Sequence, residues 1–220
     1  DGDTLWDSAA VPHEIRWDLP LPSRQGTLEF MAEVVDRVVV RIGSEAPARD
    51  LTYFCLLTVF HEDMHTEAIT YTRQTHGYPA PRLGVPSADV RDGGGPLAGD
   101  VVIPGGTYQL GGTHDLGFIF DNEKWAHAVE VASFALARAP VTNAEFAAFV
   151  RDRGYQRREL WSDEGWRWRE RAGAGHPVYW RYEGGDRWCR RHFDRLVELE
   201  PHHPVIHVNW HEAEAYCRWA

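Results

Sequence analysis

Hydrophobic residues recur at helical spacing between Thr27 and Gly43, which predicts an α-helix with one buried stripe. Either Ser23 or Thr27 is a suitable N-cap, and Gly43 follows the last apolar position, as glycine often does at a helix end. The residues of the expected buried stripe are Leu28, Met31, Val34, Val35, Val38, Val39 and Ile42.

A second helix is predicted from Asp50, a plausible N-cap, to about His76, because Gly77 and Pro79 then interrupt the pattern. Both predicted helices are long, and only a short loop separates them. Such a pair is typical of half of an antiparallel helical bundle.

The pattern changes after the second helix. Residues 84–100, GVPSADVRDGGGPLAGD, are rich in glycine, proline and aspartate, which predicts a linker. We therefore expect a helical domain over residues 1–83, the linker, and a second domain over residues 101–220.

The second domain is predicted to be α+β. Residues 101–115 contain short apolar runs broken by glycine pairs, as a β-hairpin would. Residues 127–137 alternate like a strand with one buried face. Two capping boxes, each predicting the start of a short helix, are formed by Thr142 with Glu145 and by Asn209 with Glu212.

The amino-acid composition argues against nucleic acid and membranes as partners. The 220 residues carry a net charge of −10 and one lysine, Lys124, so no basic surface for nucleic acid is expected. No apolar run reaches the length of a membrane span. Three cysteines, far apart and odd in number, fit a reduced cytoplasmic protein better than a disulfide scaffold. Because the sequence begins with Asp1 and ends inside a predicted helix, we expect it to be part of a longer protein.

Two histidines four residues apart, His61 and His65, are the strongest candidates for chemistry. At about 100° per residue they lie roughly 40° apart on the predicted helix, so both imidazoles can reach one ion. Their face of the helix is otherwise largely apolar, which favours ligands pointing into a bundle core. The alternative is a pair of packed or solvated histidines without a metal.

The same stretch matches H-E-x-x-H, in which a zinc protease uses the glutamate, here Glu62, as a general base. That chemistry needs a third ligand, but the longer protease motif would place glycine and histidine where this chain has Ala68 and Tyr71. Glu67 lies about 200° around the helix from His65 and is expected to point away. Protease chemistry is therefore the less favoured interpretation.

Several segments together resemble a known family. HEDMHTEA and YTRQTHGYPAP resemble the metal-binding helix of the nonheme-iron sulfoxide synthases of ergothioneine and ovothiol biosynthesis and of selenoneine synthases. In that family a DinB-like four-helix bundle precedes a C-type-lectin-like domain of the formylglycine-generating-enzyme (sulfatase-modifying-factor) type. The resemblance implies a multidomain α+β protein containing part of each domain. The segments that resemble the second domain are IPGGTYQLGG, FIFDNEKWAHAVEV, FALARAPVTNAEFAAFV and HPVIHVNWHEAEAYCRWA.

What the resemblance implies is a nonheme Fe(II) centre held by three histidines, two of which match His61 and His65. In the family the third comes from an earlier helix, and we expect it outside this sequence. The only earlier histidine, His13, lies in a proline-rich segment and is not an expected ligand. The implied reaction is O₂-dependent formation of a carbon–sulfur or carbon–selenium bond at the imidazole of hercynine (trimethylhistidine), with a thiol or a selenosugar as donor.

Three further positions bear on the substrate. Arg24 resembles arginines with which family members grip the carboxylates of the donor, so it is a candidate substrate-binding residue. Met64 stands where some ergothioneine synthases carry glutamine, and Lys124-Trp125 stand where many members have Arg-Pro. These two departures are compatible with the selenoneine-synthase branch.

Two other functions fit parts of the same pattern. A zinc-dependent DinB-type thiol transferase or hydrolase would use the same two histidines. A lectin-like binding module would need no metal, and the helices would then be a scaffold. The metal content of the protein separates these functions from an iron enzyme.

Overall fold

The computed structural model describes residues 7, 9–44, 49–82, 84 and 97–220. The chain divides into two compact units, residues 1–60 and residues 61–220, and each is described by itself. Residues 85–96, most of the predicted linker, lie outside the described residues.

The first unit contains a 3-10 helix, η1 (His13–Asp18), and a long helix, α2 (Arg24–Ser44). Ser23 caps α2, because its Oγ accepts a hydrogen bond of 3.1 Å from the backbone N–H of Gly26. Thr27 lies inside the helix, where its hydroxyl donates to the Ser23 carbonyl at 3.1 Å. The predicted helix is confirmed, and of the two candidate caps Ser23 is the one used.

The second long helix, α3 (Arg49–His76), ends where the sequence predicts, but Asp50 lies in its first turn and is not the N-cap. Gly77 follows it in the left-handed conformation, with φ of 67°. The N–H groups of Gly77 and Tyr78 donate to the carbonyls of Gln74 at 3.3 Å and Arg73 at 3.0 Å. These two bonds form a Schellman motif, which satisfies carbonyls of the last turn and explains why a glycine ends the helix.

The expected buried stripe on α2 is wrong. Six of its seven side chains are exposed, among them Met31 at 54% and Val39 at 62%, and only Val38 is half-buried. Periodicity places apolar residues on one face of a helix, but burial needs a second element packed against that face. Among the described residues, no element covers this one. The DinB-like bundle therefore remains a prediction.

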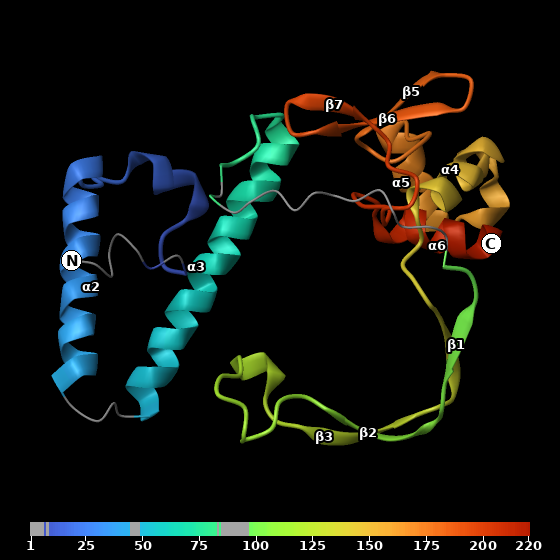
Figure 1. Ribbon diagram of the computed structural model, residues 1–220. Coiled ribbons are helices and arrows are strands. Elements are labelled where there is room, and N and C mark those ends of the chain that lie inside the picture. The colour runs from blue at the N-terminus through green and yellow to red at the C-terminus, as the bar shows by residue number, and fades with distance from the viewer. Residues whose placement is uncertain (1–6, 8, 45–48, 83, 85–96) are drawn as a thin grey trace. The chain divides into compact units, whose positions relative to one another are not determined.

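The first strands of the second unit form two antiparallel pairs (Figure 1). β1 (Asp100–Ile103) pairs with β4 (Phe134–Ala137), and β2 (Gly106–Leu110) pairs with β3 (His127–Val131). A short 3-10 helix, η2 (Asp121–Glu123), lies in the connection between β2 and β3.

Two expectations about this region are wrong. The hairpin expected within residues 101–115 is not formed, and the strand expected over residues 127–137 is two strands with mostly exposed side chains. Gly105 explains the interruption between the two pairs. A Cβ atom there would lie 2.9 Å from the backbone nitrogen of Ser133 and 3.2 Å from the carbonyl oxygen of Val131. Two backbones therefore meet at a position that only glycine fits.

The hydrophobic core of the second unit is built on three helices, α4 (Asn143–Arg151), α5 (Asp163–Ala172) and α6 (Trp210–Trp219). Two 3-10 turns contribute to it, η3 (Gly154–Gln156) and η4 (Arg158–Leu160). Both predicted capping boxes are present, at the starts of α4 and α6. The buried core residues are Phe146, Ala147, Phe149, Tyr155, Leu160, Trp161, Trp180 and Ala215.

A three-stranded antiparallel sheet belongs to the same unit, with strands in the order β5 (Trp180–Gly184), β6 (Arg187–His192) and β7 (Arg195–Glu198). The two residues Phe193 and Asp194 form the turn between β6 and β7. Helices and antiparallel strands make the unit α+β, as predicted. Within the described ranges, no helix is both long and apolar enough to cross a membrane.

Candidate functional site

The two candidate metal ligands, His61 and His65, lie on one side of α3. Their ring centroids are 4.5 Å apart, with an angle of 80° between the ring planes. This is the placement that an i,i+4 spacing predicts, and it lets two imidazole nitrogens approach a single ion. Two imidazoles supply only part of a coordination shell. Among the described residues, no group of three or more histidine, cysteine, aspartate or glutamate side chains could hold a metal ion.

The expectation that this pair points from a buried face is wrong. Both histidines are exposed, and so are Phe54 at 60% and Met64 at 54%. The reason is the same as for α2: the apolar pattern is present, but no described element packs over it. Exposure leaves the imidazoles free to take part in a site completed by further residues.

The two other residues considered from the sequence lie in the first unit. Arg24 is the first residue of α2 and is exposed. His13 is the first residue of η1 and is also exposed. The substrate-binding role expected for Arg24 remains a prediction.

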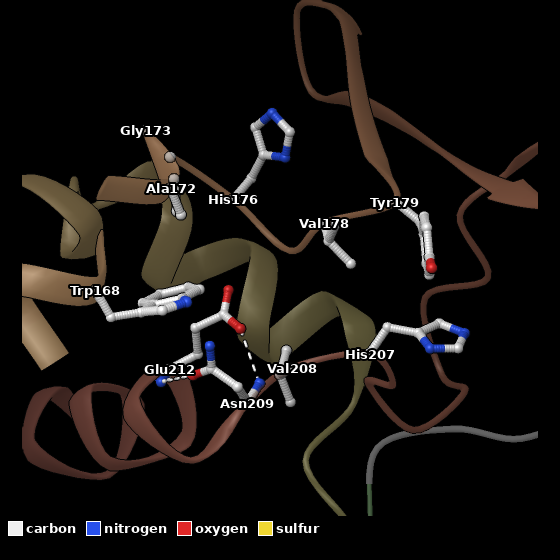
Figure 2. Close-up of a pocket in the computed structure, with 12 residues that line it drawn as sticks. Trp168, Ala172, Gly173, His176, Val178, Tyr179, His207, Val208, Asn209 and Glu212 are labelled. Carbon is white, nitrogen blue, oxygen red and sulfur yellow. Dashed lines mark hydrogen bonds between the residues drawn. The ribbon is translucent and has the colours of Figure 1, made fainter. Parts of the chain in front are cut away.

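A pocket of about 480 Å³ lies in the second unit (Figure 2). Figure 2 shows Trp168 and Glu212 at one end and the rings of Tyr179 and His207 at the other. The walls combine aromatic rings, imidazoles and small apolar side chains, so the pocket is suited to a small organic molecule. Its remaining lining residues are Ala172, Gly173, Ala174, Gly175, His176, Val178, Val208 and Asn209.

Glu212 is the only carboxylate of this pocket, and its oxygens are already bonded. Oε2 accepts a hydrogen bond of 2.8 Å from the backbone N–H of Asn209, which closes the capping box of α6. Oε1 accepts one of 2.5 Å from the Tyr155 hydroxyl. Burial raises the pKa of the Glu212 carboxyl above its ordinary value, and the pKa of Tyr155 is also raised, chiefly by burial. Glu212 is therefore a structural residue that holds α6 and the core together.

The opposite end of the pocket presents the polar rings of Tyr179 and His207. The Tyr179 and His207 ring centroids are 4.8 Å apart, and the two planes are almost perpendicular. Burial lowers the pKa of His207 below 6.5, and the positive charges of Arg190 and Arg191 lower it further. The imidazole is therefore neutral at pH 7. A neutral imidazole and a phenol offer hydrogen bonds without fixing a charge on the ligand.

Arg190 forms a bidentate ion pair with Glu200, and this pair makes stability depend on pH. Nε donates to Oε2 and Nη2 to Oε1, both at 2.7 Å. The hydrogen bonds from Arg190 hold the pKa of the Glu200 carboxyl below its ordinary value of 4.5, while burial partly opposes them. A carboxyl whose pKa is lower in the folded state contributes stability above its unfolded pKa and loses that contribution as the pH falls through the folded value.

We expect Glu200→Gln to lower the free energy of unfolding by about 1 kcal/mol at pH 7. Below pH 4.5 the difference from the wild type should shrink as the wild-type carboxyl becomes protonated. Urea unfolding at several pH values between 7 and about 3 measures this difference. A difference that stays constant over the whole range would contradict the assignment to Glu200 ionisation.

The segment that contains this pocket matches a known protein family. Residues 87–220, more than half of the chain, match the model of the sulfatase-modifying factor enzyme 1-like domain, the FGE-sulfatase family. The chain belongs to the FGE-sulfatase family. All of the pocket residues, the aromatic core and the three-stranded sheet lie within the matched FGE-sulfatase segment.

The chain is similar to relatives of two kinds. The hercynine oxygenase of Mycolicibacterium thermoresistibile is 35% identical over 219 residues, which are 99% of this chain and 48% of that protein. The hercynine oxygenase of Mycolicibacterium smegmatis is 33% identical over 99% of this chain and 50% of its own length. The formylglycine-generating enzyme of Thermomonospora curvata is 33% identical over 56% of this chain and 44% of its own length. The chain thus spans about half the length of these relatives.

Two features could not be predicted from the sequence. One is a pocket of the FGE-sulfatase domain, and the other is the contact of this domain with α3. The pocket at Tyr179 and His207 was not predicted, since its walls come from segments separated in sequence. A set of hydrogen bonds from Gln74 and Arg191 was not predicted either. The available signal for Gln74 was its place in YTRQTHG, one of the segments that carry the family resemblance.

Proposed function

We propose that this chain is part of an O₂-dependent nonheme Fe(II) enzyme that forms a carbon–sulfur or carbon–selenium bond at the imidazole of hercynine. The observation that carries the proposal is the match to hercynine oxygenases over 99% of the chain. That match includes the α3 segment with its two histidines as well as the FGE-sulfatase domain. A relative that shared only the FGE-sulfatase domain would not support a metal centre on α3.

The extent of the matches favours this function over that of a formylglycine-generating enzyme. Relatives with that name match 54% to 56% of the chain, whereas two hercynine oxygenases match 99% of it. A zinc-dependent thiol transferase would use the same histidines, and a binding module would need neither. Both are outcomes that the experiment below distinguishes.

The residues present fit an iron ion in the chemistry of their donors. His61 and His65 offer imidazole nitrogens from one helix face, with ring centroids 4.5 Å apart. We propose that a third ligand from outside the described residues completes the set. A bound Fe(II) with open positions would supply the activation of O₂ and of a soft sulfur or selenium donor. Arg24, exposed at the start of α2, is the proposed contact for carboxylates of the donor.

The proposed cellular compartment is the cytoplasm. All three cysteines, Cys55, Cys189 and Cys217, are free thiols. Free thiols in a protein of this size fit a reducing compartment. The proposed partners are small molecules, namely hercynine, O₂ and a thiol or selenosugar donor, with neither nucleic acid nor membrane among them.

The proposal is tested on full-length protein purified without oxygen. Stoichiometric iron is expected by elemental analysis, and zinc or no metal would contradict the proposal. Hercynine and O₂ are then supplied with γ-glutamylcysteine, cysteine or a selenosugar in separate reactions. We expect one donor to be consumed together with hercynine and a product linked at the imidazole carbon to appear in mass spectra. Stoichiometric iron without any hercynine-dependent O₂ uptake would also count against the proposal.

A further inference from the structure

Gln74 is a polar residue buried at the end of a helix whose middle is exposed. It lies in the last turn of α3, and only 6% of its surface is accessible. Its side-chain amide makes two hydrogen bonds to the turn between β6 and β7. Nε2 donates to the carbonyl of Arg191 at 3.0 Å, and Oε1 accepts from the backbone N–H of Phe193 at 2.6 Å. Both polar atoms of the buried amide are therefore satisfied by backbone groups 117 and 119 residues away in sequence.

Arg191, on strand β6, donates hydrogen bonds from the sheet to the end of α3. Its Nη1 donates to the backbone carbonyl of Gln74 at 2.5 Å, and its Nη2 donates to the carbonyl of Thr75 at 3.3 Å. Carbonyls in the last turn of a helix have no partner within the helix, and their partial negative charge attracts a cation. The guanidinium also stacks on the Tyr179 ring, with its central carbon 4.4 Å from the ring centroid. Arg191 is thus held in place on the sheet while it caps α3.

The backbone conformations of Gly77, after α3, and of Phe193, after β6, both allow this contact. A Cβ at Gly77 would lie 3.2 Å from Nη1 of Arg191, so glycine at the helix end also makes room for the guanidinium. Phe193 adopts the left-handed conformation, with φ of 55°, which is uncommon for a bulky residue. Its N–H is bonded to Gln74, and its carbonyl accepts from Nη1 of Arg191 at 3.0 Å. The strained turn is therefore held by the same two side chains that dock the helix.

We propose that Gln74 and Arg191, with the Phe193 backbone, form a clasp that positions the metal-binding segment of α3 relative to the FGE-sulfatase domain. At 1.5 Å per residue, Gln74 is about 14 Å along the helix from His65. A separation of nine positions at about 100° each leaves a rotation of about 180°, so the histidines lie on the opposite side of the helix from the clasp. The clasp thus sets the position and the rotation of the helix without covering the face that would hold the metal.

This role deepens the proposed function and rests on it. In an enzyme that must align an imidazole, a chalcogen donor and O₂, a small shift of the metal relative to the substrate is costly. The contacts of Gln74 and Arg191 include neither His61 nor His65, so the two are positioning residues and not catalytic ones. Their loss should leave iron binding at His61 and His65 intact while it reduces turnover.

The test compares Gln74→Leu with the wild type in the full-length protein. Hydrogen exchange is expected to accelerate at the Phe193 amide, because it loses its acceptor, Oε1 of Gln74. The amides of Gly77 and Tyr78 should also exchange faster, because the end of α3 is no longer held on the sheet by this side chain. Iron content should stay stoichiometric. The kcat/KM for hercynine is expected to fall by about tenfold to a hundredfold, and less product should form per O₂ consumed.

Arg191→Lys tests the same contact with a milder change, and it replaces Gln74→Leu if that variant does not fold. Lysine keeps the charge but cannot donate in the fork geometry of the guanidinium, so an intermediate loss of turnover is expected. Arg181→Met is the matched control, because Arg181 lies on the neighbouring strand β5 with its side chain 68% exposed. Its exchange and turnover should equal those of the wild type.

The outcomes are distinct for the clasp and for the proposed function. If Gln74→Leu exchanges faster but keeps the wild-type kcat/KM and the wild-type yield of product per O₂, the positioning role is overturned. If hydrogen exchange in Gln74→Leu is unchanged, the clasp itself is overturned. If the wild type shows no hercynine-dependent O₂ uptake, the proposed function fails. In that case hydrogen exchange still tests the clasp. Faster exchange in Gln74→Leu supports it, and unchanged exchange rejects it.

Discussion

Replacing His61 or His65 by alanine is expected to remove iron binding and turnover together. The two imidazoles lie on one side of α3, and their ring centroids are already 4.5 Å apart. Loss of either leaves the ion with too few nitrogen donors to compete with water. We expect iron affinity to fall by more than about a hundredfold, which is the upper end of the loss caused by changing a residue that merely supports a ligand. Anaerobic Fe(II) titration and elemental analysis measure the loss.

His76→Ala and Glu67→Gln are the matched controls for these variants. His76 is an exposed histidine on the same helix, stacked on Tyr78 with ring centroids 5.5 Å apart. Glu67 is an exposed carboxylate two residues from His65, expected to point away from the pair. Both variants should retain stoichiometric iron and turnover. Full iron occupancy and activity in either His61→Ala or His65→Ala would rule out the proposed centre.

Replacing Phe149 by alanine is expected to lower the free energy of unfolding of the second unit by about 3–5 kcal/mol. The Phe149 side chain is completely buried. Its ring packs against those of Phe146 and Tyr155, with centroid distances of 5.3 Å and 5.6 Å, and against Trp219 at 5.8 Å. Alanine would leave a cavity among rings that come from several elements, and stiff aromatic neighbours can fill it only in part. Urea unfolding followed by tryptophan fluorescence measures the change.

Phe134→Ala provides the comparison for a phenylalanine outside the core. Phe134 lies on β4 with 45% of its surface exposed, so its loss should cost less than about 1 kcal/mol. Equal destabilisation by the two substitutions would show that the aromatic cluster around α4 and α6 is not the centre of stability of this unit.

The core and the candidate site differ in how far they could be predicted. The start of α4 follows from Thr142 and Glu145, because each bonds backbone groups three residues away. The His61–His65 pair follows from helical geometry in the same way. Gln74 offers no comparable signal. A glutamine near a helix end is usually exposed, and only the β6–β7 turn brought against it makes this one a buried hydrogen-bonding residue.

The features that depend on neighbours within about four residues could be predicted from the sequence. These are the start of α2 at Ser23, the end of α3 at Gly77, the capping boxes, the histidine pair and the α+β character of the second unit. Tertiary structure alone decided which strands pair, which apolar faces are covered and where the pocket forms. At Gly105 two distant backbones meet, and at Arg191 a side chain on a strand caps a helix. The physical reason is that hydrogen bonds and packing between distant segments depend on how those segments are brought together, whereas a cap or a helical face is complete within a single turn.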